Sequence, residues 1–126
     1  MTPVLKLIAA ATLASTAATP AFAHPKLVAS MPAAKATVAS TTQIALKFSE
    51  KLLAPASGAT LTMTAMPGMP NHVMKIDGLE AAVAPDGKTL VVTLAQPLGT
   101  GSYRLDWHVV GADTHRIQGN LVFAVR

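Results

Sequence analysis

Alternation of hydrophobic and polar residues marks five segments of the chain as half-buried β-strands. In residues 43–49 (QIALKFS), Ile44, Leu46 and Phe48 lie on one face. Ala45 and Lys47 lie on the other face. Two closing strands place Trp107 and Phe123 on their inward faces, so we expect these two aromatic residues to form the centre of the core. The same alternation recurs in residues 58–64 (GATLTMT), 89–94 (TLVVTL), 102–110 (SYRLDWHVV) and 119–125 (GNLVFAV).

Turn-forming residues separate these segments. Proline, glycine and small polar residues cluster between them, and Pro85-Asp86-Gly87 is typical of a tight hairpin. No stretch after residue 26 has the period of an amphipathic helix. Short strands at regular intervals therefore predict an all-β fold, a single antiparallel Greek-key β-sandwich that resembles a small immunoglobulin-like or cupredoxin-like barrel.

The N-terminal residues have a different pattern. A basic start with Lys6 is followed by an apolar run over residues 7–13 and by the small-residue cleavage site AFA at residues 21–23. The run is shorter than the roughly 20 apolar residues that span a bilayer, which disfavours a membrane anchor. We therefore expect residues 1–23 to be a signal peptide that directs export, and residues 24–126 to form one domain.

Charge and cysteine content narrow the possible functions. The formal charge is +4, but the cations are scattered singly and form no basic stripe with aromatic residues, which argues against nucleic-acid binding. The chain has no cysteine, so an exported domain has no disulfide, and a blue-copper centre, which requires a thiolate, is excluded. A metal site in this chain must use histidine, methionine or carboxylate ligands.

One group of candidate metal ligands depends on removal of the signal peptide. Cleavage after Ala23 would make His24 the first residue, and its imidazole and α-amine could then chelate one ion. Pro25 follows and has no backbone N–H to serve as a further ligand. Asp113 and His115 lie two residues apart in a segment that we expect to be extended, so their side chains would project to the same side. Two imidazoles, an amine and a carboxylate suit Cu(II).

Simpler interpretations of these residues remain open. Asp113 can stabilise a turn through its own backbone, and His115 can be a solvated loop histidine. Glu50 follows the first predicted strand and is either a further carboxylate ligand or a surface residue. His108 lies on the face opposite Trp107, and we expect it to be a surface residue.

A methionine segment, residues 63–74, offers a second group of ligands. It holds four of the six methionines and is interrupted by two prolines and a glycine. The three-residue spacing matches the period of polyproline II, which would align these side chains along one edge. Thioether sulfur is a soft ligand that suits Cu(I). We therefore interpret the segment as a Cu(I) site with candidate ligands Met63, Met66, Met69, His72 and Met74.

The methionine segment also has other interpretations. Met63 shares a face with Leu61 and can equally belong to the core. The remaining methionines could form an adaptable surface for a protein partner. Exposed methionine without a bound ion would be an oxidation liability in an exported protein.

Together these features resemble the CopC family of periplasmic copper-binding proteins, also called the copper resistance protein C family. The resemblance rests on AHPKL after the signal peptide, FSEKL, the Met-x2-Met-x2-Met run, the closing segment YRLDWHVVGADTHRIQGNLVFAV and the absence of cysteine. It covers nearly all of the expected mature chain.

The resemblance implies a Greek-key β-sandwich in the periplasm with two copper sites at opposite ends. By position, His24, Asp113 and His115 match the family's Cu(II) ligands, and Glu50 matches a carboxylate that some members use. The methionines with His72 match a Cu(I) site. The implied function is copper buffering and transfer without catalysis. We expect a monomer whose partner is a CopD-type inner-membrane copper transporter or another periplasmic copper protein.

Two other functional classes are alternatives to copper carriage. A copper oxidative enzyme of the polysaccharide monooxygenase type also begins with a metal-chelating histidine. Against it, the chain is short, and one Trp and one Tyr are too few for a flat sugar-binding face. A structural or adhesive sandwich domain would bind no metal tightly.

Overall fold

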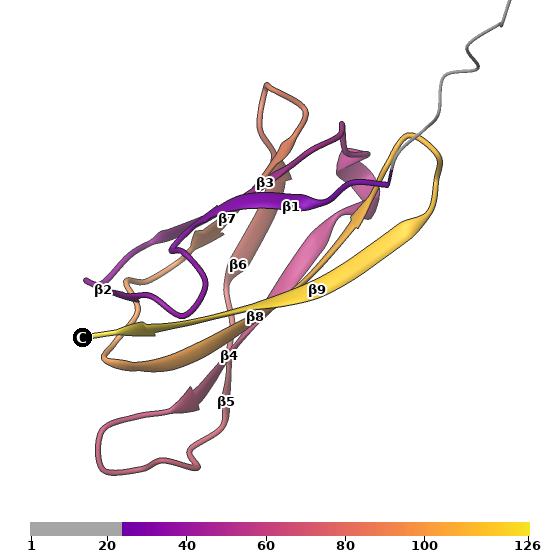
Figure 1. Ribbon diagram of the computed structural model, residues 1–126. Coiled ribbons are helices and arrows are strands. Elements are labelled where there is room, and N and C mark those ends of the chain that lie inside the picture. The colour runs from indigo at the N-terminus through magenta and orange to yellow at the C-terminus, as the bar shows by residue number, and fades with distance from the viewer. Residues whose placement is uncertain (1–23) are drawn as a thin grey trace, which may run out of the picture.

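The computed structural model describes residues 24–126, and the predicted signal peptide lies outside them. These residues form two β-sheets packed face to face (Figure 1). The strand order is β1-β3-β7-β6 in the four-stranded sheet and β2-β9-β8-β4-β5 in the five-stranded sheet. Between residues 24 and 126, no helix has the length and hydropathy needed to cross a lipid bilayer. The predicted all-β sandwich is confirmed.

Nine strands and one short 3-10 helix make up the fold. Every strand pairing is antiparallel except that of β2 with β9, which is parallel. The elements are β1 (Leu27–Met31), β2 (Thr37–Val38), β3 (Gln43–Phe48), η1 (Ala54–Ala56), β4 (Gly58–Ala65), β5 (Met74–Ile76), β6 (Leu79–Val83), β7 (Thr89–Leu94), β8 (Gly101–Val110) and β9 (Arg116–Val125).

The five strands that the sequence predicts are the interior strands of the two sheets: β3, β4, β7, β8 and β9. The four that it misses, β1, β2, β5 and β6, are the edge strands. None of the edge strands contains a fully buried residue, so each lacks a clear alternation of buried and exposed positions. In addition, β9 begins at Arg116, three residues before the predicted start, because the preceding turn is shorter than expected.

The core is made from alternate residues of the interior strands. Burial follows the predicted two-residue period most clearly in β8, where every second side chain from Tyr103 to Val109 faces the opposite sheet. Three residues of the buried hydrophobic core, Leu52, Leu98 and Val110, lie outside the predicted alternation. The predicted residues that are buried are Ile44, Leu46, Phe48, Leu61, Met63, Leu90, Val92, Leu94, Tyr103, Leu105, Trp107, Val109, Leu121, Phe123 and Val125.

Two aromatic pairs lie within this core. Trp107 meets Phe48 of the opposite sheet edge to face, with ring centroids 5.0 Å apart. Tyr103 stacks on Phe123, its direct partner across β8 and β9, at 5.6 Å. Trp107 and Phe123 both lie in the core, as expected. Strand register pairs Phe123 with Tyr103 and leaves Trp107 opposite Gly119.

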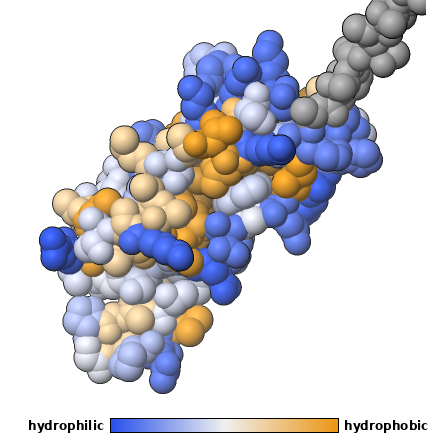
Figure 2. Space-filling model, viewed as in Figure 1, coloured by the Kyte–Doolittle hydropathy of each residue, from blue (hydrophilic) through white to orange (hydrophobic). Residues whose placement is uncertain are grey.

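The two connections that carry the candidate ligands lie at opposite ends of the sandwich. Figure 1 shows the segment that leads into β1 beside the β8–β9 connection at one end, and the β4–β5 connection, which carries the methionine segment, at the other. On the face shown in Figure 2, hydrophilic residues predominate at the end where the β8–β9 connection lies. The fold thus separates the two groups of candidate ligands.

Gly119 provides the space that the Trp107 indole occupies. A Cβ atom at Gly119 would lie 2.5 Å from Cζ2 of Trp107, closer than van der Waals contact allows. We predict that Gly119→Ala lowers the free energy of unfolding by about 1–3 kcal/mol through overpacking. Urea denaturation of the metal-free protein measures this change.

Gly99→Ala is the matched control for this prediction. Nothing lies within 4 Å of the corresponding Cβ position at Gly99, and its φ is not positive. This variant should change the free energy of unfolding by no more than about 0.5 kcal/mol. Equal urea midpoints for Gly119→Ala and Gly99→Ala would contradict the packing argument.

Candidate metal centre

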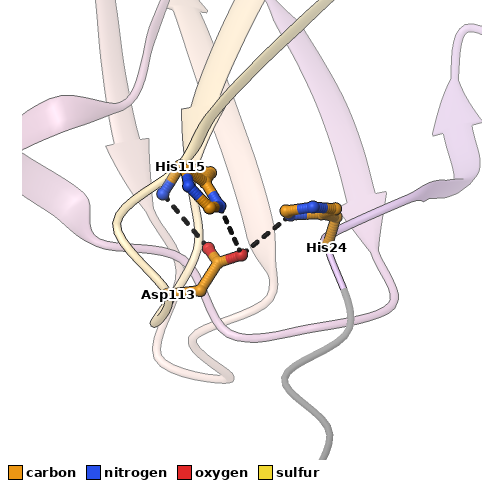
Figure 3. Close-up of side chains that lie close together, drawn as sticks. All are labelled: His24, Asp113 and His115. Carbon is orange, nitrogen blue, oxygen red and sulfur yellow. Dashed lines mark hydrogen bonds and ion pairs between the residues drawn. The ribbon is translucent and has the colours of Figure 1, made fainter.

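Asp113 joins two histidines that are far apart in the sequence (Figure 3). Its Oδ2 lies 2.8 Å from Nδ1 of His24 and 3.1 Å from Nδ1 of His115. A carboxylate only accepts hydrogen bonds, so in the neutral rings both contacts place the proton on Nδ1 and leave the lone pair on Nε2. We call His24, Asp113 and His115 the histidine cluster.

Tight packing around Pro25 positions His24 in the cluster. Pro25 is fully buried, and a Cβ at Gly111 would lie 2.8 Å from its Cδ. Gly111 also forms a β-bridge with Leu52, which follows β3. The absence of a side chain at Gly111 therefore lets the start of the domain approach the β8–β9 connection. Gly111 is not among the residues that the sequence pattern singles out, although a glycine directly after a buried strand is a signal of close backbone approach.

The β8–β9 connection is a tight turn, so the expectation of an extended segment is wrong. The amide of Thr114 donates to the carbonyl of Gly111 at 2.9 Å, and Thr114 has a φ of +66°. This left-handed conformation is unfavourable for a β-branched residue and occurs at few non-glycine positions. The turn, rather than strand alternation, brings the side chains of Asp113 and His115 to the same side.

Asp113 both stabilises this turn and contacts the imidazoles. Its Oδ1 accepts a hydrogen bond from the amide of His115 at 3.2 Å, while Oδ2 faces the two rings. Burial by itself would raise the pKa of the Asp113 carboxyl. The hydrogen bonds from the amide and the imidazole of His115, with the nearby charges of both histidines, outweigh this effect and lower the pKa. The carboxylate is therefore ionised at neutral pH.

The histidine cluster has the geometry of a small metal site. One ligand atom from each of its three residues lies within 4.8 Å of the others. The side chain of Asp113 is 14% exposed, whereas those of His24 and His115 are 57% and 71% exposed, so an ion can reach the rings from solvent. The ring centroids are 5.2 Å apart and the ring planes are tilted by 58°. Imidazole and carboxylate donors in this arrangement suit a borderline divalent ion such as Cu(II).

Glu50 is not a member of the histidine cluster. It is half-buried and lies just after β3, at the same end of the fold as Pro25, because the amide of the neighbouring Ser49 donates to the carbonyl of Lys26. Its role as a further ligand stays a prediction.

His108 lies on the outer face of the five-stranded sheet, as expected. It is half-buried rather than freely exposed, because its ring packs over Gly58, where a Cβ would lie 3.0 Å from Cε1. Burial and the charge of Arg116 lower the pKa of His108. The residue lines a hollow of about 570 Å³ together with Thr60 and Gln118. It takes no part in the histidine cluster.

A tight reverse turn divides the methionine segment. Met66 and Met69 exchange both backbone hydrogen bonds, at 2.9 and 3.2 Å, around Pro67 and Gly68, and Gly68 has a φ of +77°. The expectation of a polyproline II segment is therefore wrong, since Pro-Gly at the centre of a turn favours chain reversal. The two methionines face each other across the turn, so their side chains start on the same side.

Strand pairing brings a second pair of methionines together. Met63 in β4 and Met74 in β5 are direct cross-strand partners. Met63 is only 7% exposed and belongs to the core, whereas Met74, on the edge strand, is 45% exposed. The core interpretation of Met63 is thus the one that the packing supports.

The remaining donors of the methionine segment differ in exposure. Met69 is 49% exposed, Met66 packs partly against the core, and His72 is half-buried. The amide of His72 donates to the carbonyl of Met69 at 3.2 Å, which keeps the imidazole-bearing residue close to the turn. The four donors that are not fully buried are Met66, Met69, His72 and Met74.

Comparison with known proteins identifies relatives along most of the chain. A family model described as the CopC domain matches residues 27–126. Copper resistance protein C of Xanthomonas campestris pv. juglandis is 53% identical over 113 residues, covering 90% of this chain and 88% of the relative. Copper resistance protein C of Pseudomonas syringae pv. tomato is 48% identical over 106 residues, covering 82% of each chain.

A solved structure has the same fold as this chain. The crystal structure of PcoC, described as a methionine-rich copper resistance protein from Escherichia coli, superposes with a TM-score of 0.75 at 42% identity. The match covers 82% of this chain and the whole of PcoC.

The lowered pKa of Asp113 predicts a pH-dependent contribution to stability. The ionised carboxylate stabilises the folded state above the unfolded pKa of about 3.9, and this contribution disappears as the pH falls through the lower folded-state pKa. Metal-free Asp113→Asn should therefore be less stable than the unchanged protein at pH 7, and the difference should shrink at pH 3. Urea unfolding of both proteins at the two pH values tests this, and a difference that does not change with pH would contradict it.

Proposed function

Because the chain belongs to the CopC family, we propose that it is a periplasmic copper-resistance protein that binds Cu(II) at the histidine cluster and Cu(I) at the methionine segment. The observation that carries this proposal is the convergence of His24, Asp113 and His115 within 4.8 Å. The family consists of copper-binding resistance proteins and not of enzymes, so the oxidative-enzyme alternative is set aside.

Cu(II) would take the place of the two protons that lie between Asp113 and the imidazoles, and each neutral ring would then carry its one N–H proton on Nε2. The ion accepts lone pairs from the two imidazoles and the carboxylate of Asp113, which are already oriented toward one another. The negative charge of Asp113 offsets part of the charge of the ion. Because an imidazole must be deprotonated to bind a metal ion, Cu(II) affinity falls as the pH is lowered.

Export and signal cleavage complete the Cu(II) site. Cleavage after Ala23 frees the α-amine of His24, which then closes a chelate ring with the imidazole of the same residue. Glu50 is an additional carboxylate that can approach the ion from the end of β3. Full Cu(II) affinity thus requires the processed protein in the periplasm.

Cu(I) binds at the other end, where the donors are soft. Met66 and Met69 face each other across the turn, and Met74 and His72 lie on the returning chain. Thioethers favour Cu(I) over Cu(II), so the oxidation state of the ion decides which end of the molecule is loaded. Met63 supports this site from the core through its cross-strand partner Met74.

The separation of the two sites suits buffering and transfer. A monomer can hold one ion at each end without the two ions competing for ligands. Copper then passes to a CopD-type inner-membrane transporter or to another periplasmic copper protein.

Titration of the processed protein with Cu(II) and with Cu(I), read by native mass spectrometry, should give one ion of each kind per chain. Binding of neither ion would overturn the proposal.

Addition of one glycine before His24 tests the N-terminal chelate. The extension converts the α-amine into an amide, so Cu(II) affinity should fall by about tenfold or more, while Cu(I) affinity should not change. Competition titration against a chromophoric chelator measures both affinities. Unchanged Cu(II) affinity and an unchanged visible spectrum would exclude the amine as a ligand.

Replacement of the turn methionines tests the Cu(I) site. Met66→Leu combined with Met69→Leu conserves side-chain volume, so the free energy of unfolding should change by less than about 1.5 kcal/mol. Cu(I) binding should be lost. Met31→Leu is the control, because Met31 is 74% exposed and lies in β1, outside the methionine segment. Retention of Cu(I) binding by the double variant, or its loss in Met31→Leu, would contradict the assignment.

A further inference from the structure

Of the five methionines within residues 24–126, three are exposed, Met66 is half-buried and Met63 is buried. Met31, Met69 and Met74 are 74%, 49% and 45% exposed, whereas Met63 is 7% exposed. Oxidants in solution reach thioethers in proportion to their accessibility. The exposed group therefore includes two proposed Cu(I) ligands and one methionine with no proposed role.

We propose that Met69 and Met74 are sites of reversible oxidation by peroxides, and that their conversion to sulfoxides switches off Cu(I) binding. The inference rests on the proposed Cu(I) function of the methionine segment and adds its regulation. In each reaction the O–O bond of the peroxide breaks and one oxygen forms a bond with Sδ of methionine. The sulfur loses two electrons, and hydrogen peroxide is reduced to water.

Oxidation removes the soft-donor character that suits the thioethers to Cu(I). A sulfoxide presents a polar oxygen and a less electron-rich sulfur, so it is no longer a soft donor. After oxidation of Met69 and Met74, the donors of the methionine segment that remain and are not fully buried are Met66 and His72. Met63 cannot replace the lost ligands, because its side chain is packed in the core.

The histidine cluster should be insensitive to the same oxidation. It contains no thioether, and it lies at the opposite end of the sandwich (Figure 1). Peroxide would thus convert a carrier of both oxidation states into a carrier of Cu(II) alone. Methionine sulfoxide reductase would restore the Cu(I) site.

Occupancy of the site should protect the same two methionines. A metal ion that takes the sulfur lone pair blocks the atom that peroxide oxidises. Ag(I) is the appropriate probe because it is soft like Cu(I) but does not react with peroxide to form radicals. Met31 serves as an internal control, since it is exposed but distant in sequence from the methionine segment.

The test measures sulfoxide at each methionine by peptide mass spectrometry after treatment with hydrogen peroxide, with and without Ag(I). We expect Met31, Met69 and Met74 to be oxidised faster than Met63 in the free protein. Ag(I) should slow oxidation of Met69 and Met74 by several-fold and leave Met31 unchanged. Equal oxidation of these two residues with and without Ag(I) would overturn the proposal.

A second measurement compares metal binding before and after oxidation, in a Met31→Leu background so that the exposed sulfoxides arise only in the methionine segment. Loss of groups that merely support a metal ligand costs about 10- to 100-fold in affinity, so loss of two ligands should weaken Cu(I) binding by at least about tenfold. Cu(II) binding should be unchanged, and the reductase should restore Cu(I) affinity.

The outcomes separate this inference from the proposed function. If the untreated protein does not bind Cu(I), the proposed function itself is wrong. If the untreated protein binds Cu(I) and the oxidised protein binds it equally well, only the oxidation switch is wrong. Circular dichroism before and after treatment distinguishes loss of ligands from loss of the fold, and unfolding by oxidation would also count against the switch.

Discussion

The carboxylate of Asp113 is the interaction on which the candidate Cu(II) site depends. It accepts contacts from His24 and His115, and it also holds the backbone of the turn that presents them. Its pKa is lowered by these contacts despite partial burial, so the group is ionised when the histidines are neutral. A single charged side chain therefore shapes the turn, fixes the start of the domain and supplies the negative charge that a divalent cation requires.

The sandwich holds the two chemically different groups of candidate ligands at opposite ends. Interior strands form a continuous core between the two ends, and the core contains no buried charged residue within residues 24–126. Imidazole and carboxylate donors lie at one end, and thioethers lie at the other (Figure 1). Because the chain has no cysteine, its soft ligands are the thioethers, which favour Cu(I).

Sequence periodicity predicts the interior strands because their side chains alternate between core and solvent. It misses the edge strands, where neither face is fully buried, and it cannot assign aromatic partners, which depend on register between distant strands. For the sites, residue types identify the three members of the histidine cluster. Their convergence depends on the conformation of Thr114 and on the close approach of Pro25 to Gly111, neither of which has a periodic signal. Likewise, a spacing of three residues suggested polyproline II where Pro67-Gly68 forms a turn.

The most direct test of the central claim is pulsed electron paramagnetic resonance of the processed, Cu(II)-loaded protein labelled with ¹⁵N-histidine. The chain has four histidines, so His72 and His108 are replaced by glutamine to leave only the two in the cluster. Coordination by both histidines and the amine of His24 predicts three directly bound nitrogens, all of them sensitive to the label, because His24 supplies both an imidazole and the amine. A directly bound nitrogen that is insensitive to the label, or coupling to only one imidazole, would contradict it.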